Sequence, residues 1–167
     1  MRRFIVGVMG QGEGAEELAL AQACELGALI AGEGWIVLSG GRDSGVMRAV
    51  NQGAKQVSGS LTLGILPSSM IAPGPDIDIV VVTDMHNARN NINVLSSDVV
   101  VACGSAGAGT VSEIALALKA EKPVVLLSPD SEAQALFMKL GNGRVYVSNT
   151  PVETVAIIKK TFFSSGL

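Results

Sequence analysis

An apolar run and a segment of helical periodicity are joined by Cys103-Gly104-Ser105-Ala106-Gly107-Ala108-Gly109-Thr110-Val111-Ser112-Glu113-Ile114. The run before it, residues 98–102, is Asp-Val-Val-Val-Ala, and such β-branched runs are typical of a strand buried on both faces. After the glycines, Val111, Ile114, Ala115 and Leu118 recur at the spacing of one helix face. The stretch therefore predicts a strand, a glycine loop and a helix, in that order.

The predicted loop has the chemistry of a phosphate cradle. Glycines lack a Cβ atom, so the backbone can turn sharply and come close to a ligand. Thr110 is expected to cap the helix, whose free N–H groups and positive dipole end favour an anion. Glu113 is expected in the first helical turn, where it either complements the helix dipole or acts on the ligand. The residues that we expect to hold a phosphate here are Gly104, Ser105, Gly107, Gly109 and Thr110.

The composition indicates a chain with much buried surface. Of 167 residues, 48% are hydrophobic and 16% are charged, and the mean hydropathy is +0.43. This length suits a single domain, which we expect to span residues 1–167. Few charged side chains remain to cover the surface of a monomer, so we expect a homo-oligomer, either a dimer or a tetramer.

The charge and the cysteines limit the classes of partner. A net charge of −3 argues against general binding to nucleic acid or to an anionic membrane, so any anion site is local. Cys24 and Cys103 stand far apart, which favours neither a disulfide framework nor a cysteine metal site. We therefore expect a cytoplasmic protein without a catalytic metal. Residues 1–10 are expected to form a first strand rather than an export signal, and no apolar run approaches the ~20 residues that span a bilayer.

Two further glycine loops follow predicted strands. The loop at residues 10–14 lacks the spacing of a dinucleotide fingerprint, which argues against ordinary NAD binding. The loop at residues 40–45 opens a helix, and it places an arginine where an anion can reach it. The residues of these two loops that we expect to contact an anion are Gly10, Gly12, Gly40, Gly41 and Arg42.

A polar cluster at residues 83–93 leads into another helix. The buried side of this helix is expected to carry Ala88, Ile92 and Leu95. Arg89 stands beside that apolar stripe, near the start of a helix that follows a strand, and this place favours a role toward the ligand.

Three features are weaker candidates for function. His86 is the only histidine, and a lone histidine is more often a structural hydrogen-bonding residue than a ligand. The sulfur of Cys103 stands where it could approach a metal, although a small apolar core residue is the simpler interpretation. The segment at residues 68–75 is rich in serine and proline, and it is expected to cross the structure or to cover a site.

Strands and helices alternate along the whole chain. The predicted strands lie at residues 4–9, 35–39, 61–66, 77–82, 98–102, 124–127 and 144–147. Alternation of this kind predicts an α/β protein with a largely parallel, doubly wound sheet that carries helices on both faces. Ligands bind such sheets at the carboxyl ends of the strands, where all three glycine loops fall. The simplest ligand for these loops is a phosphorylated small molecule.

Three motifs give the chain a resemblance to known proteins. They are Gly40-Gly41-Arg42-x-x-Gly45-Val46-Met47, Ala88-Arg89-Asn90-Asn91-Ile92-Asn93-Val94-Leu95-Ser96 and Gly107-Ala108-Gly109-Thr110-x-x-Glu113-Ile114-Ala115-Leu116-Ala117-Leu118-Lys119. Together they resemble the molybdenum cofactor carrier proteins over nearly the whole chain. The resemblance implies a homo-oligomeric, Rossmann-like protein. It also implies that the chain binds, stores and protects the molybdenum cofactor, a pterin monophosphate, as cargo for molybdenum enzymes.

The same motifs resemble a wider superfamily that includes the "lonely guy" phosphoribohydrolases, once called lysine decarboxylases. Those enzymes cut the base from a nucleoside monophosphate with an arginine and a glutamate, and Arg89 and Glu113 occupy the corresponding places. Their loop reads Pro-Gly-Gly-x-Gly-Thr, whereas this chain has neither the proline nor the paired glycines. We therefore expect a carrier. The alternatives are a nucleoside 5'-monophosphate phosphoribohydrolase, in which Arg89 and Glu113 would be catalytic, and a non-catalytic nucleotide sensor.

Overall fold

The strands pair into one sheet in the order β4-β3-β2-β1-β5-β6-β7, and every neighbouring pair is parallel. The computed structural model describes residues 2–163. The strands are β1 (Ile5–Gly10), β2 (Ile36–Ser39), β3 (Leu61–Leu66), β4 (Ile79–Val82), β5 (Val99–Cys103), β6 (Val124–Leu127) and β7 (Val145–Ser148). The predicted doubly wound parallel sheet is confirmed.

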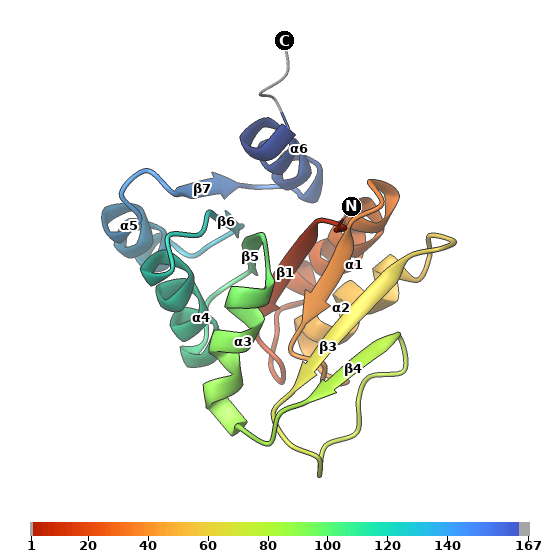
Figure 1. Cartoon of the computed structure of the whole chain (residues 1–167). Coiled ribbons are helices and arrows are strands. Elements are labelled where there is room, and N and C mark those ends of the chain that lie inside the picture. Colours follow the sequence, from red (N-terminus) through yellow and green to blue (C-terminus); the bar gives the residue numbers. More distant parts are fainter. Residues whose placement is uncertain (1, 164–167) are drawn as a thin grey trace.

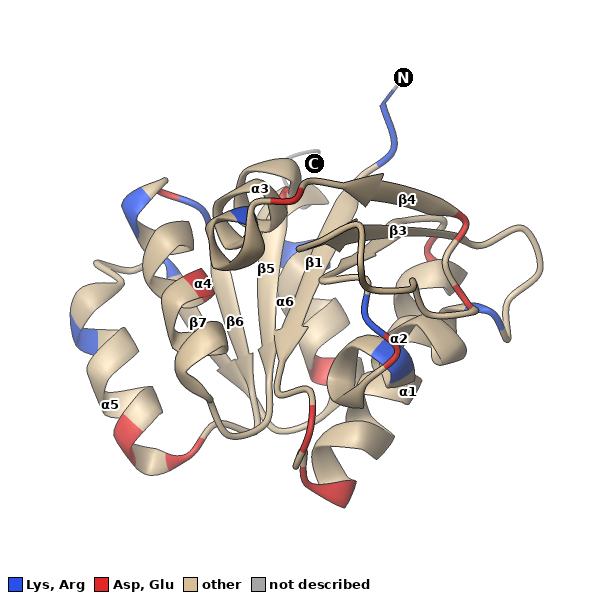
Figure 2. Cartoon of the chain, turned by 90° about the horizontal axis from the view of Figure 1, so that it is seen from below, with Lys and Arg blue, Asp and Glu red and all other residues tan. Residues whose placement is uncertain are grey.

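Helices cover both faces of this sheet (Figures 1 and 2). They are α1 (Glu17–Gly32), α2 (Gly45–Ala54), α3 (Arg89–Ser96), α4 (Ala108–Lys119), α5 (Ser131–Leu140) and α6 (Pro151–Phe163), with a short 3-10 turn η1 (His86–Ala88) before α3. One apolar core joins the sheet to α1, α2 and α6, and a second joins it to α3, α4 and α5. The β-branched residues of β5 are buried on both faces because they contribute to both cores.

The chain winds outward from the centre of the sheet in two directions. From β1 it proceeds through β2 and β3 to β4, and from β5 it proceeds through β6 to β7. The strand order therefore reverses between β1 and β5, which are aligned so that Gly10 lies beside Cys103. Ligands bind at such a switch point in open parallel sheets. The three glycine loops follow β1, β2 and β5, three adjacent strands, so the topology brings them together.

The helix after the polar cluster differs from its prediction. Its buried residues are Arg89, Asn93 and Val94, whereas Leu95 is 54% exposed and Ala88 is exposed. Of the predicted apolar stripe only Ile92 packs against the core, because the inward face of α3 carries Arg89 and Asn93, which contact Glu113 of α4. The strand before it is also shorter than predicted, since β4 begins at Ile79 rather than at residue 77.

The start of α4 also differs from its prediction. The helix begins at Ala108 and its preceding residue is Gly107, so Thr110 does not cap it and lies in the first turn. Glu113 is consequently in the second turn, too far along the helix to complement its N-terminus. The buried face of α4 carries Thr110, Glu113, Ile114 and Ala117, whereas the predicted Val111, Ala115 and Leu118 are exposed or half-buried.

Two further sequence predictions concern residues 1–10 and residues 68–75. Residues 1–10 contain strand β1, as expected. The segment at residues 68–75 packs against the second glycine loop. Gly74 N–H donates to the Gly41 carbonyl at 3.0 Å, and Arg42 and Pro73 form an isolated antiparallel β-bridge. Across residues 2–163, no helix combines the length and the hydropathy that a membrane crossing requires.

Candidate functional site

A pocket of about 360 Å³ opens at the carboxyl ends of β1, β2 and β5. Its walls come from all three glycine loops and from the starts of α3 and α4. The predicted residues that line it are Gly10, Gly12, Gly40, Arg42, Arg89, Gly107, Gly109, Thr110 and Glu113. The folded chain thus brings most of the candidate residues to one place.

Three predicted residues lie outside the lining of this pocket. Gly41 packs against β3, where an added Cβ would lie 3.1 Å from the Leu66 side chain. Gly104 has a φ of +74°, the left-handed conformation that favours glycine, and it turns the chain out of β5. Ser105 donates a hydrogen bond of 3.1 Å to the Glu16 carboxylate. These residues shape the loops that carry the pocket.

The two loops after β1 and β2 pack closely together. Val46 N–H donates to the Gln11 carbonyl at 3.0 Å. An added Cβ on Gly45 would lie 2.0 Å from the Gly12 carbonyl oxygen, and Gly45 has a φ of +51°. The pocket wall therefore depends on a residue without a side chain at this position.

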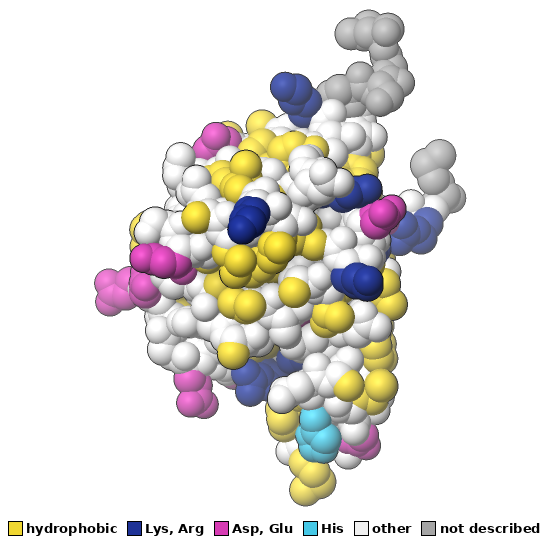
Figure 3. Space-filling model, turned by 90° about the vertical axis from the view of Figure 1, so that its left-hand side faces the viewer, with side chains coloured by type: hydrophobic (Ala, Val, Ile, Leu, Met, Phe, Trp, Pro, Cys, Tyr) yellow, Lys and Arg dark blue, Asp and Glu magenta, His cyan; other side chains and the backbone are white. Residues whose placement is uncertain are grey.

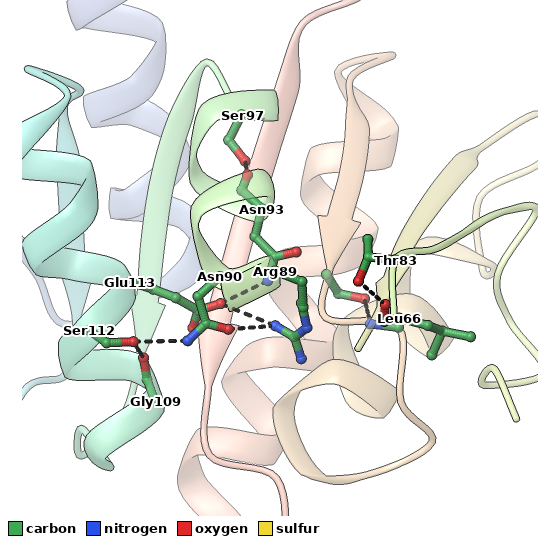
Figure 4. Close-up of polar contacts among 11 residues, drawn as sticks. Leu66, Thr83, Arg89, Asn90, Asn93, Ser97, Gly109, Ser112 and Glu113 are labelled. Carbon is green, nitrogen blue, oxygen red and sulfur yellow. Dashed lines mark hydrogen bonds and ion pairs between the residues drawn. The ribbon is translucent and has the colours of Figure 1, made fainter. Parts of the chain in front are cut away.

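Arg89 extends into the pocket from the first turn of α3, and it is only 8% exposed. Its Nη1 donates to Asn90 Oδ1 at 2.9 Å and faces Glu113 Oε1 at 3.5 Å (Figure 4). Its Nε is buried and has no hydrogen-bond partner within the described part of the chain. An added Cβ on Gly40 would lie 2.7 Å from Arg89 Nη2, so glycine is required for the guanidinium to reach this place.

Glu113 faces Arg89 from α4 and is 6% exposed. Asn93 Nδ2 donates to Glu113 Oε1 at 2.8 Å. Burial raises the pKa of Glu113, although the hydrogen bond from Asn93 and the charge of Arg89 oppose that shift. Burial likewise lowers the pKa of Arg89, against the attraction of Glu113. The pocket therefore holds a cation and a carboxyl group that are both poorly solvated.

The positive charge that faces the pocket comes from individual arginines rather than from an extended basic surface, as the net charge of the chain predicts. Arg42 and Arg89 both line the cavity, and the positive charge of Arg42 further lowers the pKa of Arg89. Elsewhere, Lys and Arg are spread over the loops and helices without forming a row along any one element (Figure 2). Two arginines beside glycine loops and a helix N-terminus are a chemically suitable set for an anion such as phosphate.

Sequence reasoning missed several pocket residues. They are Val8, Met9, Gln11, Glu13, Met47, Pro67, Asn87 and Asn90. Asn87 and Asn90 also border a more apolar groove between α3 and α4, lined by Met85, Ala88, Ala115 and Leu116 among others. The four asparagines at residues 87–93 are a signal that could have revealed the polar wall, because amides are costly to bury without partners.

The weaker candidates lie apart from the pocket lining. Cys103 is buried, its thiol donates to the Ala19 carbonyl at 3.5 Å, and burial raises its pKa to about 12. This thiol therefore remains protonated at neutral pH, as an apolar core residue does. His86 is exposed on η1. Between residues 2 and 163, no three His, Cys, Asp or Glu side chains gather in a group that could hold a metal ion.

The sheet order, the glycine loops at its switch point and the buried arginine define a class, that of Rossmann-like α/β proteins with a candidate anion pocket. The model of the SLOG cluster4 family matches residues 3–155. This chain belongs to that family.

Three comparisons with individual proteins extend this result. The structure of the molybdenum cofactor binding protein from the phototrophic bacterium Rippkaea orientalis is 52% identical, with a TM-score of 0.92 over 96% of this chain and 98% of the other. The molybdenum cofactor carrier protein from Chlamydomonas reinhardtii is 46% identical, with a TM-score of 0.89 over 95% and 98% of the two chains. A cytokinin riboside 5'-monophosphate phosphoribohydrolase from Mycobacterium tuberculosis is 31% identical over 151 residues, which cover 83% of this chain and 79% of the relative.

Proposed function

We propose that this chain binds the molybdenum cofactor as cargo, protects it and delivers it to molybdenum enzymes. The observation that carries the proposal is the 52% identity to the Rippkaea orientalis cofactor-binding protein, which extends over 96% of this chain. Identity at this level across the pocket-bearing sheet supports a shared ligand class more strongly than the common fold does, since one fold hosts many functions.

The pocket chemistry supports a phosphorylated cargo. The cofactor carries a phosphate monoester, and Arg42 and Arg89 supply positive charge to the cavity. The first N–H groups of α4 have no partners within the helix and add hydrogen-bond donors at the same wall. Binding requires no proton transfer, so Glu113 needs to do no more than hold Arg89 in place.

Cleavage of a nucleoside 5'-monophosphate is the second candidate function. It is favoured by the meeting of Arg89 with Glu113 in the pocket and by the 31% identity to the Mycobacterium tuberculosis hydrolase. In that reaction positive charge develops on the ribose, and Glu113 would stabilise it. Glu113 Oε1 already accepts from Asn93, however, which favours a structural task for this carboxyl group.

A homo-oligomer is part of the proposal. Edge strand β4 exposes all four of its side chains, at 39–50%, and Leu95 and Met85 are exposed on neighbouring elements of the chain. A second apolar surface lies on α5, where Leu136, Met138 and Leu140 are exposed (Figure 3). One such surface supports a dimer, and two different surfaces support a tetramer. The two free cysteines suit the reducing cytoplasm.

The proposal is tested on protein purified from cells grown with ample molybdenum. We expect molybdenum and phosphorus to copurify with the wild-type chain in equal amounts. Arg89→Ala should lower the affinity for the cargo about 10- to 100-fold, because charge-assisted hydrogen bonds contribute ~1.5–3 kcal/mol. Arg48→Ala is the matched control, since Arg48 is an exposed arginine that pairs with Asp43 outside the pocket.

A second assay separates the two candidate functions. The wild-type chain is incubated with AMP, and released ribose 5-phosphate is measured. A carrier releases none. Release that Glu113→Gln abolishes would contradict the carrier proposal and establish the hydrolase. Wild-type protein that retains neither molybdenum nor phosphorus, although the cofactor is present in the cell, would also contradict the proposal.

A further inference from the structure

A chain of hydrogen bonds connects Arg89 on α3 with the first turn of α4 (Figure 4). Arg89 Nη1 donates to Asn90 Oδ1 at 2.9 Å. Asn90 Nδ2 donates to Ser112 Oγ at 2.8 Å, and Ser112 Oγ donates to the Gly109 carbonyl at 2.7 Å. The guanidinium is thereby connected, through two side chains, to the backbone of the first turn of α4 on the opposite wall of the pocket.

The direction of these bonds requires an amide at position 90. The Ser112 hydroxyl proton is used by the Gly109 carbonyl, so this hydroxyl can only accept from residue 90. Arg89 has donors alone, so it needs an acceptor there. An amide offers both, because its oxygen faces the arginine and its nitrogen faces the serine. An aspartate would present acceptors to both neighbours.

The chain of bonds leaves other polar groups available to a ligand. Arg89 uses Nη1 for Asn90 and Glu113, while Nη2 faces Gly40 and Nε is buried without a partner among residues 2–163. On the other wall, the first helical bond of α4 runs from Val111 N–H to the Gly107 carbonyl at 2.9 Å, so the N–H groups before it are not used within the helix.

We infer that Asn90 and Ser112 are positioning residues, which fix the distance between the Arg89 guanidinium and the N-terminus of α4 and thereby set the affinity for a phosphate monoester. A phosphate presents several oxygens, so the arginine and the helix N–H groups can hold it together when their spacing is constant. This inference rests on the proposed function, namely that the pocket binds a phosphorylated molecule.

Ser112 offers the sharper test, because it does not line the anion pocket and its replacement changes no charge. Inorganic phosphate is the probe, and its dissociation constant is measured by titration calorimetry on the full chain. Ser112→Ala should weaken phosphate binding about fivefold, the value of one lost hydrogen bond. Ser112→Thr keeps a hydroxyl at the same place and should bind phosphate with the affinity of the wild type. Ser96→Ala, at the end of α3, is the matched control and should bind like the wild type.

A double-mutant cycle distinguishes positioning from a general loss of structure. Asn90→Ala should weaken phosphate binding, and adding Ser112→Ala to it should have no further effect, because both residues act through one chain of bonds. Without phosphate, Ser112→Ala should still unfold in one cooperative transition, with a midpoint lowered by no more than about 2–4 °C, the effect of one lost hydrogen bond. Additive losses, or wild-type affinity in Ser112→Ala, would overturn the inference. A wild-type chain that binds no phosphate would instead overturn the proposed function.

Discussion

Arg89 and Glu113 form a buried pair in which each side chain lowers the free-energy cost of burying the other. Removing a charge from water is expensive, and a 3.5 Å contact between Nη1 and Oε1 recovers only part of that cost. The bond that Asn93 donates to Glu113 and the acceptor that Asn90 offers to Arg89 add two further polar contacts to the pair. The pocket is therefore held by a network whose members depend on one another, rather than by a single strong ion pair.

Glu113→Gln tests this pair through pH. Above the raised pKa of Glu113 the variant should bind phosphate about fivefold more tightly than the wild type, because it removes a like charge worth ~1 kcal/mol beside the anion. Since the pKa of Glu113 is raised, the wild-type carboxyl takes up its proton as the pH falls, and the two affinities should converge. Comparing the two proteins at each pH cancels the titration of phosphate itself.

The raised pKa of Glu113 also predicts a change in stability. A carboxyl whose pKa is higher in the folded chain favours folding most at acid pH, and this contribution is lost as the pH rises through the raised pKa.

The binding test with Glu113→Gln has a contrary outcome. A ratio of the two phosphate affinities that does not vary with pH would show that Glu113 keeps the same charge over the pH range of the titration.

At the scale of elements, α1 and α2 are the scaffold of two of the three loops. Each helix follows one glycine loop, and they cross in direct backbone contact. An added Cβ on Gly27 would lie 2.0 Å from the Val50 carbonyl oxygen, and one on Gly53 would lie 1.8 Å from the Cys24 carbonyl oxygen. Backbone atoms cannot move aside as a flexible side chain can, so this crossing sets the spacing of the loops.

Gly27→Ala should therefore destabilise the protein. We expect a loss of ~1–3 kcal/mol in the free energy of unfolding, because the new methyl forces the two helices apart. Chemical denaturation measures the change. Gly32→Ala is the control within the same helix, since an added Cβ there meets nothing within 4 Å, and better helix propensity should raise stability by up to ~1 kcal/mol. Equal effects of the two substitutions would refute close packing at the crossing.

At the scale of the whole molecule, exposed apolar side chains gather at the β4 edge of the sheet and on α5. Strand β4 has a neighbour only on the β3 side, so its other edge presents unpaired backbone groups as well. An edge with these properties is a hazard for a monomer, and burial against a second copy removes it. The proposed oligomer would also account for the low share of charged residues, 16%.

Leu95→Arg tests the proposed oligomer. A charge on this half-exposed residue of α3 should shift the mass in sedimentation equilibrium from the oligomer toward the monomer, because burying an unpaired arginine costs several kcal/mol. Val152→Arg introduces the same charge at an exposed residue of α6, on the opposite face of the sheet, and should leave the mass unchanged. Unchanged mass in Leu95→Arg would exclude the α3 surface from the contact.

The hydrophobic periodicity and the glycine spacing of the sequence predict most of the fold and many of the pocket residues. Unbroken β-branched runs such as that of β5 predict strands with two buried faces, and glycines directly after them predict close backbone approaches at one sheet edge. Because these patterns depend on neighbours in sequence, they can be read without the structure. These patterns predict Gly10, Gly40 and Gly107 at one edge of the sheet, and all three line one pocket.

Sequence patterns failed where polar residues occupy buried helix faces. In α4 the inward face carries Thr110 and Glu113 beside the predicted Ile114, and in α3 it carries Arg89 and Asn93, so the apolar pattern predicts only part of each buried face. Glu113 on α4 is the partner from the facing helix for both Arg89 and Asn93. The sequence by itself determined the parallel sheet and the loops at its rim, because local periodicity specifies them. The tertiary structure alone decided the pairing of Arg89 with Glu113 and Asn90 with Ser112, because residues more than twenty positions apart meet only when α3 packs on α4.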